Sequence, residues 1–209
     1  MPNVERVMRA AFQSDERLRE TLKEVFRELE KACKPGTIFA SNTSSLSIDD
    51  LAAGLKDPSR LVGMHFFNPA TKMRLVEVIN GAKTKEVAVE QTIGLVESIH
   101  KVPVKVRDSP AFIANRILMP YLNESICLLS EGAARKEDID TTAKLALNHP
   151  MGPFQLLDLI GLDVFVEIMK NLHKSTGNPK YKPCPLAEKM VSSGKLGRKT
   201  GEGFYKYGK

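Results

Sequence analysis

The first half of the chain alternates between helix-like and strand-like patterns of apolar residues. Over residues 3–33 the apolar positions recur every three or four residues, which predicts an amphipathic helix that ends at the KPG of 34–36. Short, mostly apolar runs then predict buried strands at 37–42, 61–67 and 73–79. Periodicity and capping residues predict further elements: helices at 47–55 and 84–101, with Ser47 and Thr84 as caps, and a strand at 102–108.

The pattern changes beyond residue 108, where helices replace strands. Helical periodicity covers 112–132 with Pro120 as an expected kink, 136–147, 154–177 as one long or two shorter helices, and 185–197. No convincing strand follows in this part before the closing GFYKY. The predicted fold class is therefore α/β plus all-α, with an α/β domain over residues 1–107 and an all-helical domain over residues 108–209.

Two titratable residues interrupt the predicted strands. His65 lies in GMHFFNP (63–69) and Glu77 lies in RLVEVIN (74–80). A buried titratable group has to be paired or lose its charge. Taken singly, each is explained by a satisfied core histidine or by a carboxylate that reaches solvent from a strand edge. Both together, at the ends of adjacent strands, favour an acid–base pair in a functional site.

Other polar residues stand near the ends of predicted elements. Ser44, in SNTSSL, follows a strand, and Asn68 precedes a proline that keeps its backbone extended at a strand end, where ligands of open α/β sheets bind. Asn115, in DSPAFIANR, stands on the first turn of a helix. The alternatives are a serine-rich turn that caps a helix for Ser44, and an ordinary polar residue near a helix N-terminus for Asn115.

Charge narrows the classes of function. The 209-residue chain carries a net charge of +6, which suits an anionic ligand such as a nucleotide or coenzyme A. Its basic residues are interleaved with acids, apart from KLGRKTG at 195–201, and no nucleic-acid motif accompanies them. We therefore expect no nucleic-acid binding.

Cysteine content and hydropathy indicate a cytoplasmic protein. Cys33, Cys127 and Cys184 are far apart and lack metal-ligand spacing, so we expect free thiols in a reducing compartment and no metal site. No apolar run approaches the roughly 18 residues of a membrane span. The polar N-terminus does not have the pattern of a signal peptide. These features predict no contact with a membrane.

Seven segments, in order, closely resemble the 3-hydroxyacyl-CoA dehydrogenases. They are TIFASNTSSL, GMHFFNP, LVEVI, DSPAFIANR, EDID, HPMGPFQLLDLIGLD and GRKTGEGFYKY, and they extend from about residue 35 to residue 209. NPKYKPCPLAEKMV looks most like the short-chain 3-hydroxybutyryl-CoA members. The resemblance implies a Rossmann-like dinucleotide-binding domain followed by an all-helical substrate-binding and dimerisation domain, and hence a homodimer through the helical domain.

The resemblance also implies a reaction, the NAD-dependent oxidation of (S)-3-hydroxyacyl-CoA to 3-oxoacyl-CoA in fatty-acid β-oxidation or butanoate metabolism. His65 is then the base that takes the hydroxyl proton, and Glu77 is the carboxylate that orients its ring. Ser44 and Asn115 contact the acyl-CoA substrate. The residues implied for the NAD cofactor are Ser44, Asn68 and Lys199, with a solvated lysine as the alternative for Lys199.

One feature of the family has no counterpart in this sequence. The family begins with a strand and a GxGxxG turn that bind the pyrophosphate, but no GxG occurs here before residue 36. We therefore expect a dinucleotide-binding domain that lacks its N-terminal half and binds NAD weakly by itself. The explanations are a fragment, a split-gene product whose other half is a separate partner chain, or a descendant without redox function. The alternative function is a catalytically impaired acyl-CoA-binding or dimerisation module.

Overall fold

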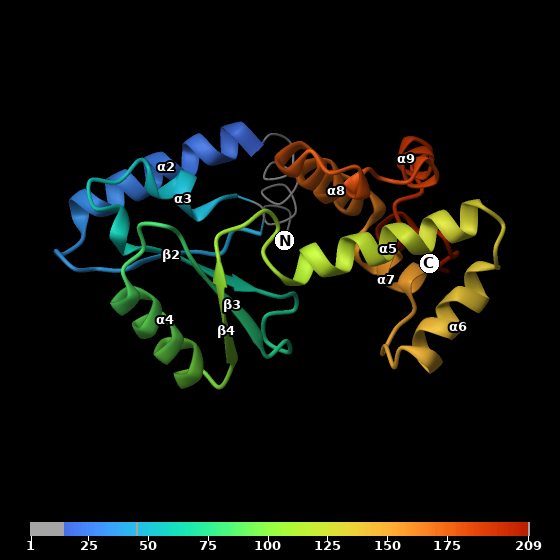
Figure 1. The fold of residues 1–209 in the computed structure, drawn as a ribbon, viewed down its shortest axis with the longest axis horizontal. Coiled ribbons are helices and arrows are strands. Elements are labelled where there is room, and N and C mark those ends of the chain that lie inside the picture. Colours follow the sequence, from blue (N-terminus) through green and yellow to red (C-terminus); the bar gives the residue numbers. More distant parts are fainter. Residues whose placement is uncertain (1–14, 45, 209) are drawn as a thin grey trace. The chain divides into compact units, whose positions relative to one another are not determined.

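The computed structural model describes residues 15–44 and 46–208. The chain divides into two compact units, Met1–Ile113 and Ala114–Lys209 (Figure 1). The apolar positions predicted between residues 3 and 14 lie outside the described residues. The domain boundary predicted between residues 107 and 108 stays a prediction.

One mixed sheet forms the centre of the first unit. Within the described residues the strand order is β1 (Phe39–Ser41), β2 (Leu61–Phe66), β3 (Leu75–Asn80) and β4 (Val102–Arg107). β1 runs parallel to β2 and β4 runs parallel to β3, whereas β2 and β3 are antiparallel. The sheet therefore reverses direction between the two strands that carry His65 and Glu77.

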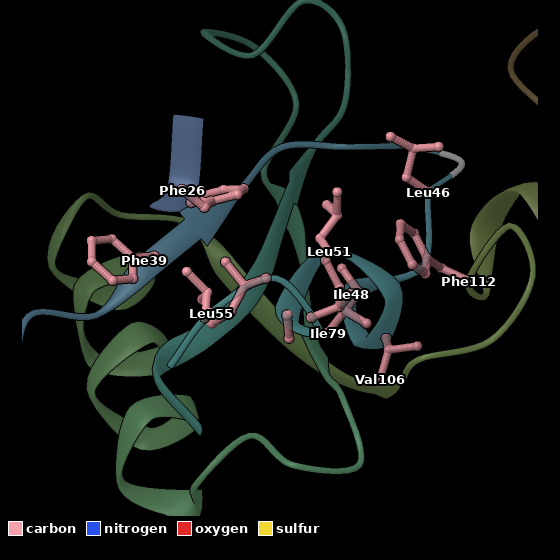
Figure 2. Packing of buried hydrophobic residues seen from close by; sticks show 11 residues of the cluster. Phe26, Phe39, Leu46, Ile48, Leu51, Leu55, Ile79, Val106 and Phe112 are labelled. Carbon is pink, nitrogen blue, oxygen red and sulfur yellow. The ribbon is translucent and has the colours of Figure 1, made fainter. Parts of the chain in front are cut away.

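Helices cover the two faces of this sheet. Alternate residues of a strand point to opposite faces, and α4 (Glu86–Ser98) packs on the face that carries Val62, Val76 and Val78. α2 (Asp15–Ala32) and α3 (Ile48–Ala52) pack on the other face. Figure 2 shows the cluster on this second face, which contains Phe26, Phe39, Leu46, Ile48, Leu51, Leu55, Ile79, Val106 and Phe112 among its members.

The α2 helix is amphipathic, as its sequence predicts. Its buried face, however, includes fewer of its apolar residues than the sequence pattern suggests. Phe26 is buried in the core, and Leu22 and Leu18, one and two turns before it, are partly buried against the same cluster. Val25 and Leu29 are exposed. The stripe that faces the sheet therefore follows strict four-residue spacing.

The α3 helix begins at the predicted cap. Ser47 Oγ accepts a hydrogen bond from Asp50 N at 3.1 Å and donates one to Asp108 Oδ2 at 2.7 Å. The same Asp108 oxygen accepts from Asp49 N at 2.9 Å. This arrangement satisfies the first turn of the helix and ties it to the chain that leaves β4.

The second unit is helical. Its elements are α5 (Ala114–Ser130), α6 (Lys136–Ala146), α7 (Pro153–Ile160), α8 (Leu162–Thr176) and α9 (Pro185–Ser192), with short 3₁₀ turns at Pro179–Tyr181 and Arg198–Thr200. The pattern at 154–177 forms two helices rather than one, because Gly161 takes a φ of 100° between them. None of the helices within the described ranges is long and apolar enough to cross a membrane.

Two buried carboxylates fasten the C-terminal segment of the second unit. Asp158 accepts hydrogen bonds from the backbone amides of Phe204 and Tyr205 at 2.8 and 2.9 Å and from Tyr207 Oη at 3.0 Å. Asp140 accepts from Tyr205 Oη at 2.9 Å. Burial, followed by this hydrogen bond, raises the pKa of Tyr205 well above its ordinary value. The segment that carries Lys199 is thereby anchored just beyond that residue.

Three local predictions are wrong. Lys85, not Thr84, is the N-cap of α4, because Thr84 Oγ1 donates to Leu61 O at 2.7 Å instead of capping the helix. α5 begins at Ala114 rather than residue 112, since two left-handed residues precede it. The closing GFYKY, all of it described, forms bends and an isolated bridge between Glu202 and Lys206 rather than a strand, because the Asp158 carboxylate binds its amides.

Candidate active site

The register of β2 and β3 brings the two predicted titratable residues together. His65 is the direct cross-strand partner of Glu77, in the same antiparallel ladder as Gly63 and Ile79. These side chains share one face of the sheet, because residues two apart on a strand point the same way. The face is the one that packs on α3, and the His65 ring contacts Phe112 of the apolar cluster on that face.

The His65–Glu77 pair is closely bonded and buried. His65 Nδ1 lies 2.8 Å from Glu77 Oε2, and the two residues are 4% and 1% exposed. When the carboxylate accepts this hydrogen bond, Nδ1 carries the proton and Nε2 of a neutral ring is left as the acceptor. The arrangement can therefore take a proton at Nε2 and stabilise the resulting imidazolium through Glu77.

Aromatic rings and a backbone amide complete the surroundings of the pair. The His65 ring lies 4.7 Å from the Phe67 ring and 5.6 Å from the Phe112 ring, measured between centroids. Ile113 N donates a hydrogen bond to Glu77 Oε1 at 3.1 Å. Both carboxylate oxygens therefore have partners, which offsets the cost of burying the group.

Ser44 and Asn68 follow neighbouring strands. Ser44 comes after β1 and Asn68 after β2, so both lie beyond the carboxyl ends of parallel strands, and both are exposed. Between them, Asn42 Oδ1 accepts from Phe66 N at 2.9 Å and ties the two strand ends together. Ser44 and Asn68 are thus available to a ligand at the edge of the sheet where ligands of α/β folds bind.

Asn115 and Lys199 belong to the second unit. Asn115 is the second residue of α5 and is half-buried. Lys199 is exposed and forms an ion pair with Asp163, with Nζ 2.5 and 2.6 Å from the two carboxylate oxygens. Within the first unit, the structure brings the predicted site residues His65 and Glu77 into direct contact.

Three neighbours of the pair escaped the sequence-based prediction. Ile113 contributes a backbone amide, for which a side chain gives no signal. Phe112 and Phe67 are apolar residues whose types indicate only burial. The single clue was their place within DSPAFIANR and GMHFFNP, the segments that also contain predicted site residues.

The chain was compared with known protein families and with solved structures. Residues 16–109 match the model of the 3-hydroxyacyl-CoA dehydrogenase NAD-binding domain, and residues 112–207 match the model of the C-terminal domain of the same family. The crystal structure of (S)-3-hydroxybutyryl-CoA dehydrogenase from Ralstonia eutropha is 43% identical, with a TM-score of 0.89 over 91% of this chain and 67% of that one.

The chain belongs to the 3-hydroxyacyl-CoA dehydrogenase family. A 3-hydroxybutyryl-CoA dehydrogenase of Clostridioides difficile is 51% identical over 187 residues, which are 90% of this chain and 66% of the relative. A probable 3-hydroxybutyryl-CoA dehydrogenase of Bacillus subtilis is 50% identical over 88% of this chain and 64% of its own length. The chain thus spans slightly less than two thirds of these curated relatives.

These matches decide two of the predictions. The fold class is confirmed, because both family models match in the predicted order and the structural neighbour has the same architecture. The prediction of a dinucleotide-binding domain without its N-terminal half is not borne out, since the NAD-binding model matches from residue 16 onward. The match includes nearly all of α2, which precedes the segments that resemble the family.

Proposed function

We propose that this chain carries the acid–base centre of an NAD-dependent 3-hydroxyacyl-CoA dehydrogenase, with His65 as the base. The observation that carries the proposal is the buried hydrogen bond between His65 Nδ1 and Glu77 Oε2. The match of both family models supports the reaction class. The substrate is (S)-3-hydroxyacyl-CoA and the product 3-oxoacyl-CoA, in β-oxidation or butanoate metabolism.

His65 performs the proton transfer in this proposal. Nδ1 donates to Glu77, so Nε2 receives the proton of the substrate 3-hydroxyl as the carbonyl forms. The Glu77 carboxylate then stabilises the imidazolium and keeps the ring from turning. In the reverse direction the same nitrogen returns the proton to the carbonyl oxygen. Burial strengthens both effects, since few waters compete for the pair.

The NAD-binding match and the exposed strand ends fit a nicotinamide cofactor on this unit. Ser44 and Asn68 lie beyond the carboxyl ends of β1 and β2, where a ligand of an α/β sheet binds. When bound, NAD supplies the acceptor for the hydride that leaves the 3-carbon. Ser44 and Asn68 then hold the cofactor, and Ser44 also donates to the substrate hydroxyl.

Two site residues of the second unit stay within this proposal. Asn115, half-buried on the first turn of α5, holds the thioester carbonyl of the acyl-CoA substrate. Lys199 contacts the cofactor, in exchange for its ion pair with Asp163. An exposed ion pair of this kind contributes about 1 kcal/mol or less to stability, so breaking it costs little free energy.

A homodimer through the helical unit is the proposed assembly. The second unit exposes several large apolar side chains, Ile117, Leu128, Leu145, Leu147 and Leu159. Exposed apolar surface of this kind supports a partner subunit. Light scattering that gives a monomer at working concentration would contradict this assembly. The cytoplasmic location stays a prediction from the three free cysteines, and a separate chain as partner stays a prediction as well.

Two measurements on the purified chain test the function. Oxidation of NADH in the presence of acetoacetyl-CoA, followed by absorbance, should show turnover that depends on both compounds. Calorimetry with acetoacetyl-CoA and then NADH separates binding of the substrate from binding of the cofactor. Substrate binding without turnover supports the alternative, a non-catalytic acyl-CoA-binding module. The absence of both binding and turnover contradicts the proposal for this chain.

A further inference from the structure

Two consecutive residues of the segment after β4 have left-handed backbones. Ala111 has a φ of 60° and Phe112 a φ of 55°, and neither is glycine. L-residues rarely adopt this conformation, and two in a row need surroundings that over-determine them. Such strain concentrates at functional sites.

The double turn directs one backbone amide at the Glu77 carboxylate. Phe112 N closes the turn by donating to Ser109 O at 3.0 Å. The next amide, that of Ile113, donates to Glu77 Oε1 at 3.1 Å, while Oε2 of the same group lies 2.8 Å from His65 Nδ1. The carboxylate is therefore held at both oxygens, and its rotation about the terminal bond is blocked.

The Phe112 side chain contacts the other member of the pair. Its ring is 2% exposed and lies 5.6 Å from the His65 ring, tilted by 55°. It belongs to the apolar cluster with Leu46 and Ile48 (Figure 2). One short segment thus supplies an amide to Glu77 and a packing surface to His65.

The segment is fixed at its start as well as its end. Asp108 N donates to Asn80 O at 2.9 Å at the end of β3. Asp108 Oδ2 accepts from Ser47 Oγ at 2.7 Å and from Asp49 N at 2.9 Å. These bonds anchor the chain just before the strained residues, so the direction of the Ile113 amide is determined by the turn itself.

We propose that Ala111–Ile113 is a backbone-built positioning element that keeps Glu77 in the orientation in which Oε2 binds Nδ1 of His65. The part of this element in catalysis rests on the function proposed above, whereas its effect on the tautomer of the His65 ring does not. The positioning element favours the tautomer with the proton on Nδ1 and leaves Nε2 to exchange protons. A turn that serves only to bury Phe112 has no such effect on the histidine.

The test reads the tautomer of His65 by ¹⁵N NMR of the imidazole ring, without substrate or cofactor. Ala111→Gly retains access to the left-handed region, whereas Ala111→Val disfavours it strongly. We expect Ala111→Gly to keep the parent spectrum and Ala111→Val to shift the signals toward the Nε2–H tautomer. His100→Val is the matched control, because His100 has the same φ of 60° in the same unit. It should lower the melting temperature and leave the His65 signals unchanged.

A second variant covers the case in which Ala111→Val fails to fold. An amide-to-ester replacement at residue 113 removes only the N–H that binds Glu77, and the same replacement at residue 108 removes the bond to Asn80 O as a control. The ester at 113 should shift the His65 signals and the ester at 108 should not. Unchanged signals in the ester at 113 would overturn the positioning role, even in a chain that turns over. A shifted spectrum in a chain without turnover would instead contradict the function alone.

Discussion

Glu77 lies directly across the ladder from His65, and its Oε2 is 2.8 Å from His65 Nδ1. The two strands are antiparallel and their side chains meet on one face of the sheet, so the contact follows from strand register rather than from a flexible loop. Groups carried on strands keep their separation better than groups on loops. The sheet therefore places the two groups in contact without any ligand.

Replacement of Glu77 by Gln should impair turnover far more than binding. An amide in this place presents its NH₂ either to Ile113 N, which then loses its acceptor, or to His65 Nδ1, which then accepts and leaves the ring proton on Nε2. We expect kcat to fall about 10²–10⁴-fold with a small change in KM for acetoacetyl-CoA. Glu86→Gln is the control, since Glu86 is an exposed partner of Lys105 in the same unit. If Glu77→Gln turns over with the kcat of the parent, the Glu77 carboxylate has no role in the mechanism.

A methyl group at Gly63 should destabilise the sheet two residues before His65. An added Cβ would lie 2.8 Å from Ile79 Cβ and 3.0 Å from Ile48 Cδ1. Overpacking of this kind costs about 1–3 kcal/mol in the free energy of unfolding. Gly94→Ala is the matched control, because an added Cβ there meets nothing within 4 Å. In urea unfolding, the free energy of unfolding should fall in Gly63→Ala and rise in Gly94→Ala, relative to the parent. Equal stability of Gly63→Ala and parent would contradict the close packing.

The Glu30 carboxylate should make stability depend on pH. Burial raises the pKa of Glu30, but hydrogen bonds from the amides of Lys56 and Asp57 and from Arg60 outweigh burial and hold it below its ordinary value. A carboxyl group whose pKa is lowered by folding stabilises the fold at pH values above its ordinary pKa. This contribution is lost as the pH falls through the lowered pKa.

Glu30→Gln tests this pH dependence. The variant should lose about 1–2 kcal/mol of unfolding free energy at neutral pH, and the difference from the parent should shrink as the pH falls into the acid range. Glu28→Gln is the control, as Glu28 forms an exposed ion pair with Lys31 on the same helix. A difference between parent and Glu30→Gln that stays constant with pH would contradict the assignment.

Asp158 should be essential to the second unit. Its carboxylate accepts from two backbone amides and one tyrosine hydroxyl, and the residue is 1% exposed. Asp158→Asn turns an NH₂ group toward the amides and the hydroxyl that donate to the carboxylate. We expect the free energy of unfolding to fall by about 3 kcal/mol. Asp163→Asn, which breaks an exposed pair with Lys199, should cost about 1 kcal/mol or less. Thermal unfolding compares them, and equal effects would show that the buried bonds are not what fastens the C-terminal segment.

Much of the fold was predictable because the hydrophobic pattern is strong. The helices of both units and the strands of the first lie close to where periodicity indicated, and the capping role of Ser47 is confirmed. The ends of elements were less predictable. Thr84 has the side chain of a cap but binds Leu61 O of a strand instead. That choice depends on a tertiary contact, which local sequence does not contain.

The candidate site was predictable in its side chains and not in its backbone. His65 and Glu77 stand out because charged or titratable types rarely occur within apolar strands. The Ile113 amide gives no such signal, since every residue except proline carries one. The left-handed turn at Ala111 was equally hidden, because alanine does not mark a positive φ as glycine does.

The most direct test of the account compares turnover by the parent chain and by His65→Gln. The assay follows NADH oxidation with acetoacetyl-CoA, with calorimetric binding of acetoacetyl-CoA measured on both proteins. Because Gln cannot exchange a proton as imidazole does, we predict a fall in kcat of about 10²–10⁴-fold with nearly unchanged binding. A His65→Gln chain that turns over at the parent rate would contradict the role of His65 as the base.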